Sequence, residues 1–155
     1  MNEEPLAERD SVWIDVTNEE IDPMALSEFV ADPRAGSLVL FSGTVRDHSP
    51  GRSGVSRLEY EAYGGVASSK IAEIVDEAHG QWSILKVAAI HRVGSLDVGE
   101  PAVTVAVSSA HRSDGFEACR YIIDQLKSRV PIWKKEHWPG GAEWVAEGGN
   151  ASGVP

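Results

Sequence analysis

The chain has 155 residues, of which 42% are hydrophobic, and a formal net charge of -10 at pH 7. These values predict one soluble domain with one core, and the acidic balance argues against general binding to nucleic acid or to an anionic membrane. Cys119 is the single cysteine, which excludes an intramolecular disulfide and a cysteine-cluster metal site and favours a reducing compartment.

Neither a secretory signal nor a membrane span is visible in the sequence. The acidic first residues lack the apolar run of a secretory signal, and no later segment approaches the ~20 apolar residues of a membrane span. We therefore expect a cytoplasmic protein. We also expect a flexible N-terminus over residues 1–11, a single domain over 12–145 and a disordered tail over 146–155.

Changes of hydrophobic period along the chain predict a mixed α+β fold. Residues 12–17 are typical of a first strand. Asp22 as N-cap and Pro23 at the first helical position predict a short helix that ends near Val30. The apolar run over residues 37–46 predicts a buried strand.

A loop and a second helix are expected next. Residues 47–54, rich in Pro, Gly and Ser, predict a mobile loop that carries Arg52 as a possible lid charge. A strand is predicted over 55–61 and a helix over about 66–79, ended by Gly80. The apolar side of this helix is expected to comprise Val66, Ile71, Ile74, Val75 and Ala78.

The second half of the chain predicts an antiparallel strand pair over 83–93 and 101–109, followed by a long helix. Asp114 and Glu117 form a capping box that would open this helix, which ends near Arg129. One apolar stripe is expected on each element: Val103, Val105 and Val107 on the strand, and Phe116, Cys119, Ile122, Ile123, Leu126 and Val130 on the helix. Cys119 is therefore interpreted as a core residue and not as a nucleophile.

The segment KSRVPIWKKE contains Lys127 and Lys134 among apolar residues. Lys127 lies at the margin of the helical stripe, so its stem can pack while its amine points toward the helix end. An ammonium held against apolar surface is pushed toward its neutral form and can act as an acid, a base or a nucleophile. The alternative is two lysine stems on apolar surface with their amines in water.

Other basic residues stand at the ends of predicted elements. Arg46 ends a strand, and His111 and Arg112 lie where a strand passes into a helix N-terminus, which favours phosphate. The alternative for the second pair is a surface arginine beside a capping histidine. Together with the lysines, these residues predict a local pocket for an anionic small molecule.

Further polar groups have simpler interpretations. His91 and Arg92 form either a second basic corner or a structural pair. Glu59 and Glu61 are typical of a solvated strand face, although a glycosidase pair would also share one face. The histidines are scattered, so neither a metal site nor a cofactor is expected.

Five blocks carry a resemblance to a known family: FSGTVRDH (41–48), LEYEAY (58–63), IHRVGSLDVGE (90–100), VAVSSAHRSDGFEA (105–118) and LKSRVPIWKKE (126–136). In this order and spacing, over about residues 13–145, they resemble the catalytic (large) subunit of molybdopterin synthase, the MoaE family. The resemblance implies an α/β hammerhead-like fold, with a mixed or antiparallel sheet and flanking helices.

The resemblance also implies a reaction and partners. Cyclic pyranopterin monophosphate would receive two sulfurs from the C-terminal Gly-Gly thiocarboxylate of a small ubiquitin-like carrier protein. The product is the dithiolene of molybdopterin, made during molybdenum cofactor biosynthesis. A homodimer with one carrier at each end would form a heterotetramer, without nucleic acid or membrane.

Site residues follow by similarity. The resemblance implies that the lysines act in catalysis and flank the entry of the terminal glycine of the carrier: Lys127 and Lys134. It implies that a second group binds the pterin phosphate or completes the wall of the site: Thr44, Val45, Arg46, His111, Arg112, Lys135 and Glu136.

One segment departs from the family pattern. An arginine that reaches the neighbouring subunit often follows the Trp-Val block in the family, whereas Trp144 and Val145 here lead into Ala146 and Glu147. A cross-subunit phosphate contact from this tail would therefore need a residue other than that arginine.

Two other classes of function fit parts of the sequence. A non-catalytic module could bind a phosphorylated pterin or nucleotide, or a synthase-like subunit could have lost activity, although the presence of both lysines argues against that loss. An RNA-binding protein with a local basic patch is disfavoured by the net charge and by the lack of an aromatic and basic strand motif.

Overall fold

The computed structural model describes residues 11–145. The predictions of a flexible N-terminus and a disordered tail fall on residues 1–10 and 146–155, which lie outside the described residues. The elements in chain order are β1 (Val12–Thr17), α2 (Pro23–Val30), β2 (Ser37–Thr44), β3 (His48–Ser49), β4 (Arg52–Ser53), β5 (Arg57–Ala62), α3 (Gly64–Gln81), β6 (Ile84–Arg92), β7 (Gly94–Asp97), β8 (Pro101–Ser109), α4 (Arg112–Arg129), β9 (Ile132–Trp138) and β10 (Gly141–Val145).

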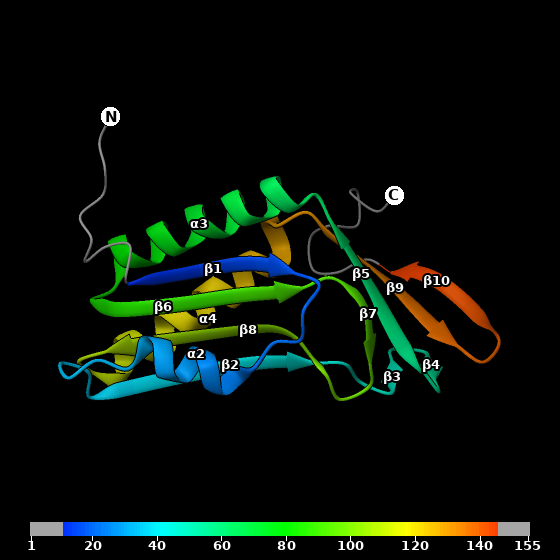
Figure 1. Cartoon of the computed structure of the whole chain (residues 1–155), viewed down its shortest axis with the longest axis horizontal. Helices are drawn as coiled ribbons and strands as arrows, with labels where there is room; N and C mark the ends of the chain where they lie inside the picture. Colours follow the sequence, from blue (N-terminus) through cyan, green and yellow to red (C-terminus); the bar gives the residue numbers. More distant parts are fainter. Residues whose placement is uncertain (1–10, 146–155) are drawn as a thin grey trace.

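The first sheet has the strand order β1-β6-β8-β2 and carries helices on both faces (Figure 1). β1 runs parallel to β6, and β8 pairs antiparallel with β6 and with β2. Side chains alternate along β8, so Val103, Val105 and Val107 pack in the core under α3 and α4, while Ala106 packs on the other face against α2. The prediction of one shared face for the three valines is confirmed.

The second sheet has the order β10-β9-β5-β7, is antiparallel throughout, and extends beyond one end of the first sheet (Figure 1). β7 lies within the connection from β6 to β8 and pairs with β5, and no strand was predicted there. The short hairpin β3–β4 replaces the mobile loop expected over residues 47–54. These layers confirm the predicted α+β fold with a mixed sheet and flanking helices.

Helix α3 differs from its prediction at both ends. It begins at Gly64 and continues through Gly80 to Gln81, because a glycine lowers helix stability without ending the helix when the residues that follow can still form it. Val66, expected in the core, is 53% exposed. The other four residues of its predicted apolar side are buried: Ile71, Ile74, Val75 and Ala78.

Helix α4 begins earlier than its capping box predicted. His111 is the N-cap, without a side-chain hydrogen bond, so Asp114 lies in the first turn instead of before it. Gly115 approaches Ser37 and Ser109 so closely that this side of the helix must face the sheet. Phe116 is consequently turned outward and is 60% exposed, whereas the rest of the predicted stripe is buried: Cys119, Ile122, Ile123, Leu126 and Val130.

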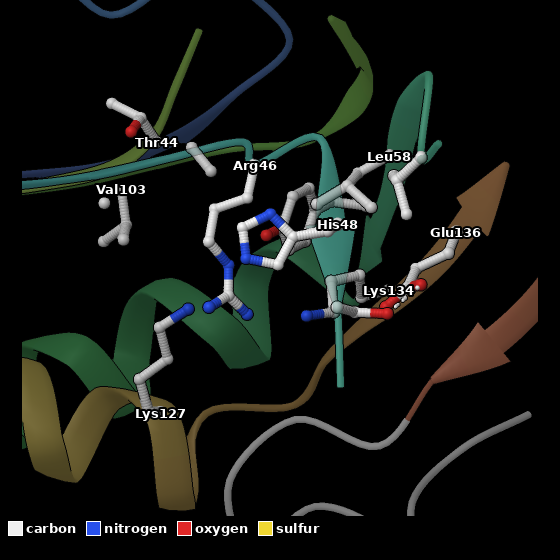
Figure 2. Close-up of a pocket in the computed structure, with 13 residues that line it drawn as sticks. Thr44, Arg46, His48, Leu58, Val103, Lys127, Lys134 and Glu136 are labelled. Atoms are coloured by element: carbon white, nitrogen blue, oxygen red, sulfur yellow. Dashed lines mark hydrogen bonds between the residues drawn. The ribbon is translucent and has the colours of Figure 1, made fainter. Parts of the chain in front are cut away.

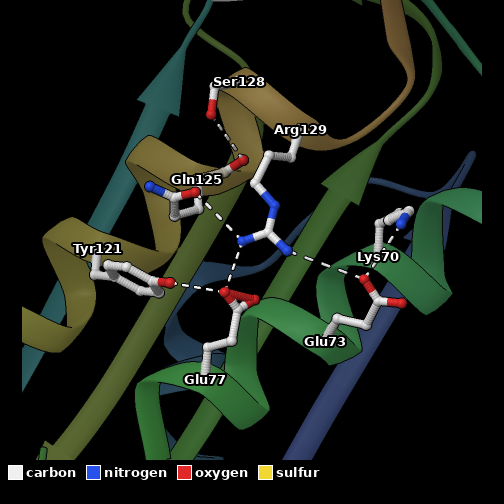
Figure 3. A network of polar contacts seen from close by, with 7 residues as sticks. All are labelled: Lys70, Glu73, Glu77, Tyr121, Gln125, Ser128 and Arg129. Carbon is white, nitrogen blue, oxygen red and sulfur yellow. Dashed lines mark hydrogen bonds and ion pairs between the residues drawn. The ribbon is translucent and has the colours of Figure 1, made fainter. Parts of the chain in front are cut away.

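A polar network joins α3 to the C-terminal half of α4 (Figure 3). Arg129 Nη1 and the Tyr121 hydroxyl each donate to Glu77 Oε1 at 2.8 Å. The hydrogen bonds from Arg129 and then Tyr121 lower the pKa of the Glu77 carboxyl. The helix end that carries Lys127 is thereby fixed to its neighbour.

None of the described helices combines the length and apolar character needed to cross a membrane.

Candidate active site

A cavity of about 160 Å³ lies where the two sheets meet. Its wall is built from the end of β2, the following loop, β3, β5, β8, α4 and β9, so segments distant in sequence converge there. The lining residues are Gly43, Thr44, Arg46, His48, Ser49, Val55, Leu58, Tyr60, Ala102, Val103, Lys127, Lys134 and Glu136. We call this space the inner cavity.

Three cationic side chains point into the inner cavity (Figure 2). Arg46 follows the end of β2, Lys127 lies in the last turn of α4, and Lys134 lies in β9. In a chain with a net charge of -10, this grouping is a local basic site. The structure therefore brings together Arg46, Lys127 and Lys134, as the sequence predicted, and Thr44 lines the same wall.

Strand alternation decides which residues of β9 face the cavity. Lys134 and Glu136 line it, while Lys135 lies between them and turns to the other side of the sheet. The ammonium of Lys135 is 5.6 Å from the ring centroid of Trp144. Lys135 is thus placed away from the wall that it was predicted to complete.

Val45 is also placed away from the cavity. Its side chain is 3% exposed in the core, its N–H donates to the carbonyl of Glu100, and its carbonyl accepts from Gly99. Any contribution of Val45 to a ligand site is therefore indirect, through the backbone that carries Arg46.

Glu136 is a buried carboxylate between two cavities. It is 2% exposed and accepts hydrogen bonds from Ser49 Oγ at 2.8 Å and Arg52 Nη1 at 3.2 Å. A second, outer cavity of about 520 Å³ shares Arg46, Ser49, Lys134 and Glu136 with the inner one. The two cavities are therefore adjacent and share this part of their walls.

His111 and Arg112 lie at the opposite end of α4 from Lys127. At a rise of about 1.5 Å per residue, the backbone positions of Arg112 and Lys127 are roughly 22 Å apart. One copy of the chain therefore does not bring the predicted phosphate ligands His111 and Arg112 to the lysines.

Three polar residues of the inner cavity were not predicted: His48, Ser49 and Tyr60. Ser49 had no signal in the sequence, because its side chain acquires a role only when the hairpin meets β9. His48 and Tyr60 fall within two of the blocks that carry the family resemblance, and this was the available signal. The Tyr60 ring meets the ring of His91 edge to face, with centroids 5.0 Å apart.

His91 and Arg92 form a structural pair and not a second basic site. His91 is 1% exposed and donates from Nδ1 to the carbonyl of Arg92 at 2.7 Å, while Arg92 pairs with Glu100. Cys119 is buried as predicted, and burial raises the pKa of its thiol to about 11. Neither the His91–Arg92 pair nor Cys119 lines the inner cavity.

Fold and cavity together define an α+β protein with a basic cavity at the junction of two sheets. Residues 16–129 match the family model described as MoaE protein. The chain is 44% identical over 142 residues to the molybdopterin synthase catalytic subunit of Thermoplasma volcanium, covering 92% of this chain and 97% of that protein. It is 48% identical over 110 residues to the subunit of the same name from Escherichia coli, covering 71% and 73%.

A solved structure agrees with these sequence matches. Molybdopterin synthase from Staphylococcus aureus superposes with a TM-score of 0.79 at 38% identity, covering 84% of this chain and 95% of that one. The chain therefore belongs to the MoaE family, as the five sequence blocks predicted.

Proposed function

We propose that this chain is the catalytic subunit of a molybdopterin synthase and acts as a sulfurtransferase. It would transfer two sulfurs from the C-terminal thiocarboxylate of a small carrier protein to cyclic pyranopterin monophosphate, forming the dithiolene of molybdopterin. The observation that carries the proposal is the convergence of Lys127, Lys134 and Arg46 on one cavity. The name catalytic subunit, which the relatives bear, supports a second subunit as partner.

The cations suit the chemistry of each transfer. The thiocarboxylate sulfur attacks a substrate carbon, and a carbon–oxygen bond breaks as the oxygen takes a proton from a lysine ammonium and leaves as water. A second water then cleaves the acyl–sulfur bond and releases the carrier as a carboxylate. Lys127 and Lys134 would supply protons and stabilise the anionic intermediates, because both amines face the space where charge develops.

The remaining cavity residues would bind and orient the substrates. Arg46 can offer two parallel N–H groups to the pterin phosphate, and Thr44 can donate beside it. Glu136 would act indirectly, since its oxygens already accept from Ser49 and Arg52. Lys135 faces the opposite side of β9 and has no direct role in this scheme.

A second copy of the chain would supply His111 and Arg112. Both residues are too far from Lys127 within one copy to contact the same small ligand. The strand β2 has one unpaired edge in the described structure. On this strand, Leu38 is 46% exposed and Phe41 is 39% exposed. Phe116, on the first turns of α4, is 60% exposed. Exposed apolar residues beside an open strand edge favour a homodimer, which would form a heterotetramer with two carriers.

The test is direct. The chain is incubated with cyclic pyranopterin monophosphate and thiocarboxylated carrier, and the dithiolene product is measured by mass spectrometry, with uncharged carrier as control. Formation of product is expected. Binding of both substrates without turnover would replace the proposal with a non-catalytic pterin-binding module.

A further inference from the structure

The hairpin β3–β4 is a small element that does not belong to either four-stranded sheet. Its two-residue strands pair with each other through the register His48 to Ser53 and Ser49 to Arg52. A hairpin of this size is at most marginally stable on its own in water. Its position therefore depends on contacts with the rest of the molecule.

Arg52 supplies most of these contacts. Its Nη1 donates to Glu136 at 3.2 Å, its Nη2 donates to Glu143 at 2.5 Å, and its guanidinium carbon lies 3.8 Å from the ring centroid of Trp138. All three partners belong to the β9–β10 hairpin or its turn, and Ser49 adds a hydrogen bond to Glu136. The side chain expected to be a mobile lid charge thus joins two hairpins.

The side chains that connect the β3–β4 and β9–β10 hairpins also form part of the wall of both cavities. Ser49 and Glu136 line the inner and the outer cavity, and Arg52 and Glu143 line the outer one. Glu136 also shares a strand face with Lys134. Loss of Arg52 would leave a buried carboxylate without its cation and would weaken the attachment of the hairpin to the strand that presents Lys134, because the hydrogen bond from Ser49 to Glu136 would remain without those of Arg52.

We infer that Arg52 is a positioning residue: by joining β3–β4 to β9–β10 it holds the outer cavity in the shape that receives the extended C-terminal tail of the carrier. This inference rests on the proposed function for the identity of the tail. Both Nη groups of Arg52 are engaged by carboxylates and one face of its guanidinium lies on Trp138, so it acts through the wall and not through the reacting atoms.

Hydrogen–deuterium exchange tests, without any substrate, whether Arg52 fixes the β3–β4 hairpin to the β9–β10 hairpin. In Arg52→Ala, amides of residues 46–56 should exchange at least about tenfold faster than in wild type, while α4 stays unchanged. Arg120→Ala is the matched control, because Arg120 makes an exposed ion pair with Asp124 on α4. Unchanged exchange in Arg52→Ala would overturn the inference, whatever the enzyme does.

Peptide binding and steady-state kinetics test whether the outer cavity receives the tail of the carrier. A short synthetic peptide ending in Gly-Gly carboxylate should bind Arg52→Ala about tenfold more weakly than wild type, and KM for the thiocarboxylated carrier should rise by a similar factor with kcat changed less than about threefold. Arg52→Lys should recover part of the loss, since one ammonium keeps the charge but cannot reach both carboxylates as a planar fork does.

The outcomes separate the two proposals. Wild type that makes no product rejects the proposed function, while exchange and peptide binding still decide the role of Arg52. An unchanged KM with a large loss of kcat would contradict a positioning role. If Arg52→Ala does not fold, Arg52→Lys and Glu143→Gln take its place, and both should raise KM by a smaller factor; unchanged KM in both rejects the inference.

Discussion

Lys127 and Lys134 reach one cavity from two independently supported elements, the last turn of α4 and the strand β9. α4 is fixed to α3 through Arg129 and Glu77, whereas β9 is held between β5 and β10. Replacing one lysine should therefore leave the other in place, and their contributions can be measured separately.

Lys127→Ala should lower single-turnover sulfur transfer by at least about 100-fold, because a positioned acid or base typically contributes 10²- to 10⁴-fold. Its melting temperature should stay close to that of wild type, since Lys127 lies at the border of the core. Product formation from pre-charged carrier and a thermal melt of the same sample measure both. Activity within a few-fold of wild type would remove Lys127 from the mechanism.

Lys134→Ala and Lys135→Ala form a matched pair on one strand. The first should lose transfer by about 10²-fold, whereas the second should retain it, because alternation along β9 turns Lys135 away from the cavity toward Trp144. The same single-turnover assay compares them. Equal losses would mean that charge near the site, and not the position of one amine, matters.

Arg112→Ala should weaken binding of the pterin phosphate by about 1.5 to 3 kcal/mol, the range for a hydrogen bond to a charged group, without affecting carrier binding. Calorimetry measures both affinities. If a second copy supplies Arg112, mixing Lys127→Ala and Arg112→Ala chains should give about a quarter of wild-type activity at a pterin concentration too low to occupy the Arg112→Ala site, since half of randomly formed dimers would contain one intact site. No recovery in dimers shown to exchange subunits would contradict the shared site.

The ion pair of Glu77 should stabilise the fold in a pH-dependent way. The hydrogen bond from Arg129 lowers the pKa of the Glu77 carboxyl below its ordinary value of 4.5 in the folded chain. The stabilisation is therefore present above pH 4.5 and is lost as the pH falls through the lowered pKa. The difference in free energy of unfolding between wild type and Glu77→Gln should therefore be largest near neutral pH and shrink in acid. Urea titrations across this range measure it, with exposed Asp76→Asn as control. A difference independent of pH would reject the ion pair as its cause.

Cys119 should react slowly with iodoacetamide at pH 8 in the folded chain. The thiol is 3% exposed and its pKa is raised to about 11, so the reactive thiolate is scarce and inaccessible. Mass spectrometry over time measures labelling, with the urea-unfolded chain as control. Rapid labelling of the native chain would place Cys119 outside the core.

Elements with strong local signals were predicted well. β1 and α2 have their expected bounds, the latter because Asp22 accepts from the N–H of Met24 and Pro23 starts the helix. β7 was missed because a strand of four residues is stabilised by its partner β5, which is distant in sequence, and not by its own composition. The β3–β4 hairpin was missed because its strands have two residues each and its side chains are held by Glu136 and Glu143 far along the chain.

The candidate site was predictable where residues stand at the ends of elements. Arg46 and Lys127 fall at such ends, so their convergence could be anticipated from the buried segments beside them. The outward turn of Lys135 follows from strand alternation, once residues 132–138 are read as a strand instead of an extended segment. The hydrogen bonds of Arg52 to Glu136 and Glu143 could not be predicted, because they depend on how the β3–β4 and β9–β10 hairpins pack together.

The strand β8 has a consequence for motion during turnover. Residues Ala102 and Val103 line the inner cavity, the strand is buried from Ala102 to Ser109, and His111 follows at its far end. A close-packed strand cannot stretch or bend without opening voids, so the span between the cavity and the His111 junction is constant within one copy. Closure around the substrate is then expected to come from movement of a neighbouring subunit or from displacement of the β3–β4 hairpin, while the first sheet keeps its shape.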